Sequence, residues 1–388
     1  MGKSIIYEPR KFVTPEVIFG VDARLLAGRC GRNLGARHAL LVTDPGVIAA
    51  GWAADVAASL EASGVGSSVF SEVTSNPRSG EVMAGAEAYR AQGCDVIVAV
   101  GGGSPIDCAK GIGIVSSNHR PILDFAGADR VPAPMPPLIA VPTTAGASAD
   151  VSQFAIITDL ERRTKAAIVS KAVVPDVALV DPRTLLTMSP QLTACTGMDA
   201  LVHAIEAFVS SGHSPLTDVH ALSAIRRVMQ SLRPCLHAPD DLEARAEMML
   251  ASLEAGLAFS NASLGAVHAT AHSLGGALDL AHGECNSIML SHVVAFNYAS
   301  APERHDRVAE AMGLDLGGLD LAGRRDRLVG AIDALRADVG VTATLSSVGV
   351  RRDDVPSLAT NALNDVCIVT NPRHANRRDV EVVYEEAL

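Results

Sequence analysis

The order of strand-like and helix-like segments is the feature that most limits the fold of this chain. In its first half, short segments rich in β-branched and apolar residues alternate with alanine-rich segments of helical periodicity. Strands are predicted at 38–44, 67–73, 94–100 and 138–144, with helices at 52–64 and 79–93. Such repetition favours a parallel sheet with helices on both faces. The last two strands are apolar without alternation, as expected of central strands buried on both sides.

The second half of the chain has a different character. A β-hairpin is predicted at 152–170, and one more strand at 177–181. From Gln191 onward the apolar residues have helical spacing, and no segment has the pattern of a strand. We therefore predict two domains: an α/β domain with a parallel sheet over residues 1–187 and an all-helical domain over residues 188–388.

Composition and charge exclude several classes of protein. Of the 388 residues, 48% are apolar, which is enough for a sizeable core and is not typical of a disordered chain. The net charge of −11 argues against nucleic acid or an anionic membrane as the main partner. The apolar runs are far shorter than the ~20 residues of a membrane-spanning helix. Seven cysteines are scattered without a Cys-x-x-Cys pair, which favours free thiols and a cytoplasmic location.

Two polar turns follow neighbouring predicted strands. The Gly101–Ser104 turn comes directly after the strand ending at Val100 and before a predicted helix that starts at Pro105. Glycines let backbone N–H groups approach a phosphate, and a helix N-terminus supplies partial positive charge. Thr143 and Thr144 open the second turn, and ligands of open α/β sheets bind where such turns meet. We predict a phosphate-binding site here, with ordinary tight turns as the alternative.

An acidic residue, Asp44, ends the first predicted strand at 38–44. Asp44 could accept hydrogen bonds from a ribose 2′-hydroxyl and would repel a 2′-phosphate, which favours NAD over NADP. A helix cap or turn residue is the alternative interpretation, and the residues alone favour it.

Two compact clusters of possible metal ligands stand in the helical half. Asp199 and His203 are four residues apart, so both project from one helix face. His268 and His272 have the same spacing, and we expect the Gly275-Gly276 pair to end their helix and return His282 to the site. Three imidazoles with one carboxylate suit Fe²⁺ or Zn²⁺ rather than Mg²⁺ or Ca²⁺. Buried core histidines are the alternative, and spacing does not decide which of the three later histidines is not a ligand.

Together these motifs resemble the iron-containing (group III) alcohol dehydrogenases, whose members include lactaldehyde reductase, 1,3-propanediol dehydrogenase and butanol dehydrogenases. The resemblance covers nearly the whole chain. It is carried by GGGSPIDCAK (101–110), PTTAGASAD (142–150), TACTGMDALVHAIEAFVS (193–210), GAVHATAHSLGG (265–276) and TNPR (370–373). It implies a two-domain fold with a nucleotide-binding domain like that of dehydroquinate synthase.

The resemblance also implies roles for individual residues. The metal ligands would be Asp199, His203, His268 and His282, and His272 would be a non-ligand histidine that helps to relay protons. The NAD contacts would be Asp44, Gly101, Gly102, Gly103, Ser104, Thr143, Thr144, Ser152 and Lys165. The substrate pocket would be bounded by Phe154, Phe259 and Cys367.

The chain departs from the family pattern at one loop and one pocket position. Family members usually have Gly-Thr-Gly-Ser-Glu where this chain has Gly146-Ala147-Ser148-Ala149-Asp150, which alters the wall near the cofactor. Phe154 replaces a residue that is polar in the lactaldehyde reductase branch, which makes a somewhat apolar alcohol or aldehyde plausible.

We therefore expect an NAD-linked, metal-dependent alcohol dehydrogenase or aldehyde reductase. It would interconvert a small primary alcohol and its aldehyde by hydride transfer, with Fe²⁺ or else Zn²⁺, in a homodimer or larger homo-oligomer. One alternative is an NAD- and metal-using carbon–oxygen lyase like dehydroquinate synthase, but the helices with the predicted ligands carry no cationic side chain for an anionic substrate. A non-catalytic scaffold protein with the same fold is the other alternative.

Overall fold

The predicted alternation of strands and helices folds into a six-stranded, wholly parallel sheet in the order β1-β9-β6-β4-β2-β3. The computed structural model describes residues 9–388. The strands are β1 (Glu16–Phe19), β2 (His38–Val42), β3 (Gly66–Phe70), β4 (Val96–Gly101), β6 (Leu138–Pro142) and β9 (Val177–Val180). Every residue of β4 and β6 is buried, which confirms their predicted central place. The edge strand β1 was not predicted, because four residues are too short to show a pattern.

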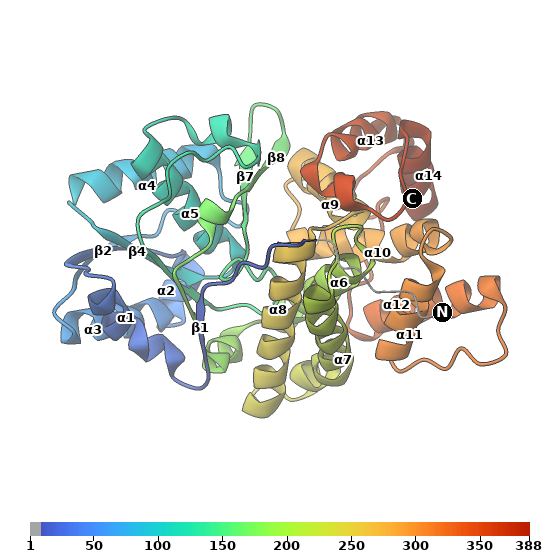
Figure 1. Ribbon diagram of the computed structural model, residues 1–388, viewed down its shortest axis with the longest axis horizontal. Coiled ribbons are helices and arrows are strands. Elements are labelled where there is room, and N and C mark those ends of the chain that lie inside the picture. Colours follow the sequence, from blue (N-terminus) through green and yellow to red (C-terminus); the bar gives the residue numbers. More distant parts are fainter. Residues whose placement is uncertain (1–8) are drawn as a thin grey trace.

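Helices cover both faces of this sheet, as predicted. They are α1 (Ala27–Asn33), α2 (Pro45–Ala49), α3 (Trp52–Ala62), α4 (Ser79–Ala91) and α5 (Gly103–Asn118). Apolar side chains of α1 and α3 pack on one face, and those of α4 and α5 pack on the other. Between these layers the carboxyl ends of the parallel strands form one edge, which faces the helical half of the molecule (Figure 1).

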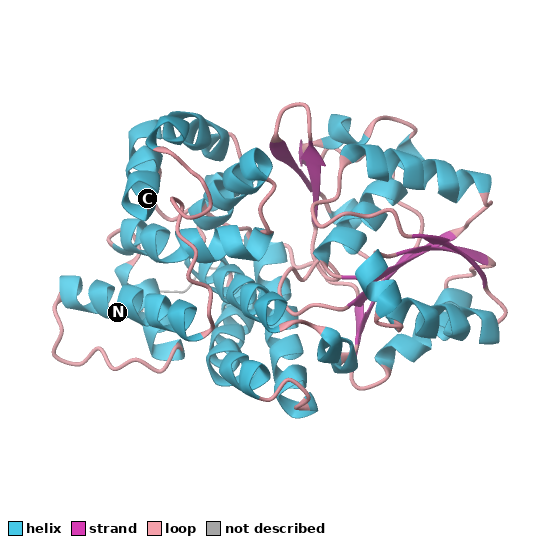
Figure 2. Ribbon diagram, turned by 180° about the vertical axis from the view of Figure 1, so that it is seen from behind, coloured by secondary structure: helices cyan, strands magenta, loops and turns pink. Residues whose placement is uncertain are grey.

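The predicted hairpin is confirmed, but it belongs to a second, smaller sheet. Strands β7 (Phe154–Asp159) and β8 (Thr164–Val169) pair antiparallel, and β5 (Gly127–Ala128) pairs parallel to β8. Figure 2 shows this hairpin apart from the main sheet, beside the helical half. The hairpin, which carries Phe154 on β7 and Lys165 on β8, therefore lies where the two halves meet.

The helical half is built from nine α-helices of the described chain around one apolar core. They are α6 (Pro190–Val209), α7 (Pro215–His237), α8 (Leu242–Ala262), α9 (Ala266–Leu278), α10 (His282–Tyr298), α11 (Pro302–Ala311), α12 (Leu321–Asp338), α13 (Val355–Leu363) and α14 (Arg377–Ala387). Capping residues define their starts: Ser189, for example, accepts the N–H of Leu192, and Pro190 occupies the first turn of α6. Figure 2 shows strands in the other half alone, which agrees with the predicted fold class.

The prediction that Gly275 and Gly276 end a helix was wrong. Helix α9 continues through both residues and ends at Leu278. A Cβ atom on Gly276 would lie 2.7 Å from the Cα of Thr164, and one on Gly275 would lie 3.0 Å from the Cε of Lys165. The glycines therefore allow α9 to pack closely against β8, and the chain turns only at Asp279, whose φ is +54°.

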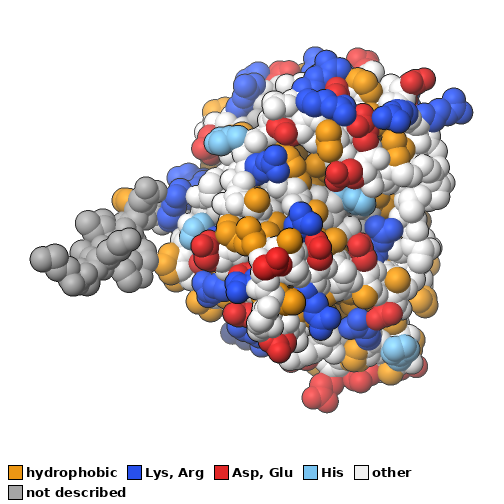
Figure 3. All heavy atoms as spheres, turned by 90° about the vertical axis from the view of Figure 1, so that its right-hand side faces the viewer, with side chains coloured by type: hydrophobic (Ala, Val, Ile, Leu, Met, Phe, Trp, Pro, Cys, Tyr) orange, Lys and Arg blue, Asp and Glu red, His pale blue; other side chains and the backbone are white. Residues whose placement is uncertain are grey.

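Helix α6 is the one helix of the described residues that is long and apolar enough to span a membrane. Of its most apolar stretch, 89% is buried inside the molecule, which is typical of a core helix. On the face in Figure 3, at the end of the helical half, acidic and basic side chains are interspersed. All seven cysteines are free. The domain boundary at 187/188 stays a prediction, and residues 1–8 of the first predicted domain lie outside the described part. The cytoplasmic location and the homo-oligomer also stay predictions.

Candidate functional site

A cavity of about 810 Å³ lies between the carboxyl edge of the sheet and helices α6, α8, α9 and α10. Two groups of predicted residues meet in its wall. From the α/β half come Asp44, Gly102, Gly103, Ser104, Thr143, Thr144, Ser152, Phe154 and Lys165, and from the helical half come Asp199, His203, Phe259, His268, His272 and His282. Residues more than 200 positions apart in the chain therefore share one cavity.

The glycine-rich turn forms a cradle without room for side chains. A Cβ atom on Gly102 would lie 3.0 Å from the Cγ2 of Thr144, and one on Gly103 would lie 2.8 Å from the Cβ of Ala147. Strands β4 and β6 are neighbours, so the two predicted turns are adjacent as expected. Helix α5 begins at Gly103, so its N-terminus faces the cavity and can receive a phosphate group. Gly101 ends β4 and is not among the residues that line the cavity.

Asp44 is a helix cap and also lines the cavity. Its Oδ1 accepts the N–H of Val47 at 2.9 Å at the start of α2, which is the structural role that the residues alone favoured. One carboxylate oxygen remains for a ligand, so the two interpretations of Asp44 are compatible.

Lys165 connects the hairpin to a loop of the other sheet. Its Nζ donates to Oδ1 of Asn76 at 2.9 Å, and Asn76 Nδ2 donates to Oδ1 of Asp279, beyond the end of α9, at 2.8 Å. Burial lowers the pKa of Lys165. Asn76 therefore joins the α/β half to the helical half at the cavity wall.

The segment with Ser152 and Phe154 is anchored by a buried lysine. Lys110 Nζ donates to the carbonyl oxygens of Ser152 at 2.9 Å and of Phe154 at 2.7 Å. Burial lowers the pKa of Lys110 to about 8, while the nearby carboxylates of Asp107 and Asp150 oppose that shift. Asp150, which stands where the resemblance leads us to expect glutamate, interacts electrostatically with this lysine.

Ser148, another departure in that loop, holds the loop against the helical half. Its φ is +50°, in the left-handed region that favours glycine. Its Oγ donates to the carbonyl oxygen of Ser252 on α8 at 2.7 Å. A Cβ atom on Gly256 would lie 2.5 Å from the Cβ of Ser148, so α8 has a glycine where the loop approaches it. The serine thus adds a contact between the two halves beside the cavity.

Asp199, His203, His268 and His282 converge on one point. One potential ligand atom of each lies within 4.8 Å of the others, although they come from three helices. Asp199, His203 and His268 are buried, and His282 is partly exposed at the cavity. The geometry separates this set from His272, which spacing alone did not.

Two of these histidines are oriented by hydrogen bonds on the side away from the cluster. His203 Nδ1 lies 3.1 Å from the carbonyl oxygen of Gly146, and His268 Nδ1 lies 2.6 Å from Oε2 of Glu206. Because both partners are acceptors, both Nδ1 atoms carry the proton, and both Nε2 atoms keep a lone pair for the cluster.

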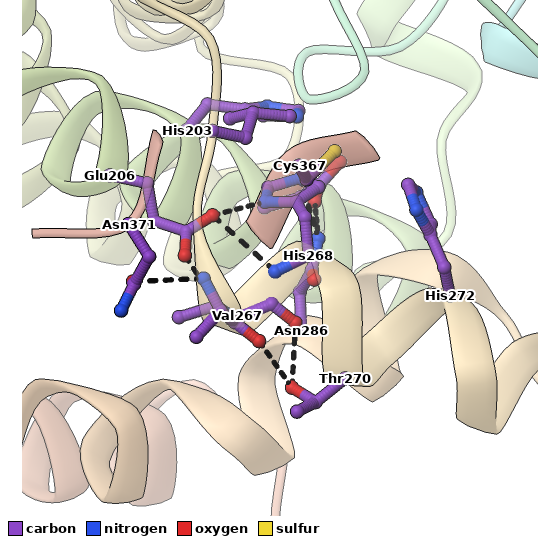
Figure 4. Close-up of polar contacts among 12 residues, drawn as sticks. His203, Glu206, Val267, His268, Thr270, His272, Asn286, Cys367 and Asn371 are labelled. Atoms are coloured by element: carbon purple, nitrogen blue, oxygen red, sulfur yellow. Dashed lines mark hydrogen bonds and ion pairs between the residues drawn. The ribbon is translucent and has the colours of Figure 1, made fainter. Parts of the chain in front are cut away.

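Glu206 has a second role at the start of α9. The N-cap of that helix, Gly265, has no side chain to accept a hydrogen bond, so the first N–H groups of α9 need other acceptors. Glu206 Oε1 accepts the N–H of Val267 at 2.7 Å, as Figure 4 shows. Burial raises the pKa of Glu206 to about 7, and the N–H groups of Val267, Gly265 and His268 oppose that rise. One carboxylate therefore fixes both the helix start and the direction of the His268 ring.

The donor set fits a divalent transition metal. Burial lowers the pKa of His203 and lowers those of His268 and His282 well below the usual range, so all three imidazoles are neutral near pH 7. Neutral imidazoles with one carboxylate are ligands for Fe²⁺ or Zn²⁺. Several lone pairs directed at one buried point repel each other, and a cation there would remove that repulsion.

His272 lies beside the cluster and is paired with a carboxylate. Its Nδ1 is 2.8 Å from Oδ2 of Asp365, whose Oδ1 accepts the N–H of Cys367 at 2.8 Å. Although burial acts to raise the pKa of Asp365, the His272 imidazole and the N–H of Cys367 hold it below its usual range. The carboxylate keeps the proton of the His272 ring on Nδ1, so Nε2 is the atom free to accept one.

The predicted substrate residues are divided by the structure. The Phe154 and Phe259 rings line the cavity with centroids 5.7 Å apart, and Phe259 stacks on His203 at 4.2 Å. Cys367 is fully buried and is not among the residues that line the cavity, so its expected place in the pocket wall stays a prediction. In this structure its backbone N–H supports the Asp365–His272 pair.

Sequence reasoning missed Glu206, Asn286, Asp365 and Asn76. Glu206 follows Asp199 by seven positions and His203 by three, so helical spacing could have placed it on the same face. Asn286 follows His282 by four, with the same signal. Asp365 and Asn76 lie far along the chain from their partners, and no spacing rule identifies them.

Comparison with known proteins agrees with this geometry. Residues 14–182 match the family model described as iron-containing alcohol dehydrogenase, and residues 193–388 match the C-terminal model of the same family. The chain is 39% identical to 1,3-propanediol dehydrogenase from Citrobacter freundii over 384 residues, covering 98% of this chain and 99% of that protein. It is 36% identical to NAD-dependent methanol dehydrogenase from Bacillus methanolicus over 377 residues, covering 97% and 99%.

A solved structure of similar sequence has the same fold. The crystal structure of a 1,3-propanediol oxidoreductase superposes with a TM-score of 0.94 at 38% identity, covering 98% of this chain and 100% of that one. The likeness therefore includes both halves of the fold.

Proposed function

Because the chain belongs to the iron-containing alcohol dehydrogenase family, we propose that it interconverts a small primary alcohol and its aldehyde by hydride transfer, using NAD and Fe²⁺, with Zn²⁺ as the alternative metal. The observation that carries the proposal is the convergence of Asp199, His203, His268 and His282 on the wall of the cavity that the glycine cradle also lines. The roles of the individual residues below are part of the proposal.

The α/β half would hold the dinucleotide. Gly102 and Gly103 would bring backbone N–H groups to its phosphates at the start of α5. Asp44 would accept the ribose hydroxyls and repel a 2′-phosphate, which favours NAD. The relative named as an NAD-dependent methanol dehydrogenase supports this choice of cofactor.

The helical half would supply the polar chemistry. Asp199, His203, His268 and His282 would hold the metal. When bound, the metal would supply a Lewis acid for the alcohol or carbonyl oxygen, and the nicotinamide would supply the hydride acceptor or donor.

The proton has its own acceptor among the residues of the chain. His272 Nε2 would receive the proton that the alcohol loses, and it would return it in the reverse reaction. Asp365 would keep the ring in the orientation and tautomer that this transfer needs, and it would stabilise the imidazolium form.

The cavity wall favours a substrate with an apolar chain. Phe154 and Phe259 are joined there by Met188, Leu192 and Leu264. Lys165 is the one lysine or arginine among the described residues that line the cavity, which argues against the lyase alternative because its anionic substrate needs several cationic groups. We therefore propose short unbranched alcohols and aldehydes as the substrate class.

The variant His268→Ala tests the function directly. We expect it to lose both bound metal, measured by elemental analysis of anaerobically purified protein, and turnover of short alcohols, measured as NADH absorbance. Full turnover by protein without metal would refute the proposed chemistry. A wild-type protein loaded with metal that fails to reduce NAD with every alcohol in the series would support the scaffold alternative.

A further inference from the structure

Asn286 faces the candidate metal site without belonging to the expected ligand set. It lies one turn after His282 on α10, and its side chain is fully buried. Its Nδ2 lies 2.6 Å from Oδ1 of Asp199 and 3.1 Å from Nε2 of both His268 and His282. Figure 4 shows Asn286 next to His268. One amide group thus contacts ligand atoms from α6, α9 and α10.

The hydrogen bonds of this amide are incomplete. Its NH₂ group has two hydrogens but faces three acceptors. Its Oδ1 is buried and has no hydrogen-bond partner among the described residues. A buried carbonyl oxygen without a donor is rare in folded proteins and calls for an explanation.

The charge of the surroundings decides which end of the amide faces the cluster. A carboxylate and two imidazole lone pairs attract N–H donors, so Nδ2 faces them in the metal-free protein. A divalent cation held by the same atoms would make this point positive, and it would repel the NH₂ group and attract Oδ1. Rotation of the amide by half a turn exchanges the two atoms with almost no change of shape.

We propose that Asn286 is a positioning residue with two states, and this rests on the proposed function because it requires the four side chains to bind a cation. Without metal, Asp199, His268 and His282 share the two hydrogens of its NH₂ group, which holds them together. With metal, the amide turns, and the carbonyl oxygen that lacks a partner faces the cation.

Two substitutions separate these states. In Asn286→Asp, the carboxylate cannot donate to the ligands and repels Asp199, but it attracts a cation. In Asn286→Leu, neither interaction remains. The matched control is Ser287→Ala, because Ser287 is the next residue on α10, is equally buried, and donates to the carbonyl oxygen of Gly283 rather than to a ligand.

The readouts do not depend on activity. We expect both Asn286 variants to melt at a lower temperature than wild type when metal-free. In competition with a chromophoric chelator, Asn286→Asp should bind Zn²⁺ at least ~10-fold more tightly than wild type, and Asn286→Leu ~10–100-fold more weakly. Ser287→Ala should bind Zn²⁺ like wild type.

A purely structural role predicts that both substitutions weaken Zn²⁺ binding, so weaker binding by Asn286→Asp would overturn the inference. Unchanged melting of both metal-free variants would overturn it as well. If a variant folds only with metal, the rate of Zn²⁺ release from the loaded protein to excess chelator replaces the titration. Release should be slower than from wild type for Asn286→Asp and faster for Asn286→Leu. The reverse order would refute the proposal. Wild-type protein that binds no Zn²⁺ or Fe²⁺ would refute the proposed function itself.

Discussion

Replacing Glu206 by glutamine tests whether one buried carboxylate prepares His268 to bind metal. The carboxylate accepts the N–H of Val267 at 2.7 Å and the Nδ1–H of His268 at 2.6 Å, and both partners are donors. Glutamine has nearly the same shape but only one acceptor oxygen. One of the two donors must therefore face the NH₂ group of the new side chain.

Either orientation of that glutamine is unfavourable. If its oxygen faces Val267, the NH₂ group faces His268, and the ring must move its proton to Nε2, where the lone pair for the metal is then lost. If its oxygen faces His268, the buried N–H of Val267 loses its acceptor, which costs about 1–3 kcal/mol. The loss in the metal-free protein should be near the lower limit, because glutamine also removes a carboxylate whose pKa burial raises to about 7.

The expected effect on metal binding is larger. Loss of such a partner of a metal-binding histidine weakens affinity ~10–100-fold, which corresponds to about 1.4–2.8 kcal/mol. A Zn²⁺ titration against a chromophoric chelator measures the loss of affinity, and thermal melting of the metal-free protein measures the loss of stability. Ser273→Ala is the control. Ser273 lies on α9, as His268 does, but its Oγ donates to the carbonyl oxygen of Leu358 on α13 and contacts no candidate ligand. A glutamine variant with wild-type Zn²⁺ affinity would refute this reasoning.

Four further substitutions address the reaction and its specificity. His272→Ala should retain bound metal while kcat falls ~10²–10⁴-fold, and Asp365→Asn should lower kcat in the same direction by less; loss of metal from either would contradict the assigned roles. Asp44→Gly should raise kcat/KM for NADP relative to NAD, and an unchanged ratio would remove Asp44 from cofactor selection. Phe154→Ser should shift kcat/KM from unbranched alcohols toward small diols, and an unchanged ranking in a substrate series would show that Phe154 does not determine specificity.

Local patterns in the sequence were sufficient for most of the fold. The buried strands β4 and β6 were predictable because they are apolar throughout, and their two turns had to be adjacent because parallel strands end at one edge. The predicted hairpin formed as β7 and β8. The predicted end of α9 was wrong, because Gly275 and Gly276 allow the helix to pack closely against β8, and no local rule reveals that contact.

For the candidate site, the sequence by itself determined the types of donor and their pairs on single helix faces, because a spacing of four residues is a property of one helix. Only the tertiary structure decided which histidines meet, since His282 joins His268 while His272 turns to Asp365. It also decided the hydrogen-bonding partners, because a buried N–H or carboxylate takes whichever group the packing of distant segments places beside it. In that way Glu206 acquires its contact with the far side of the His268 ring, and Asn286 its contacts with the candidate ligand atoms.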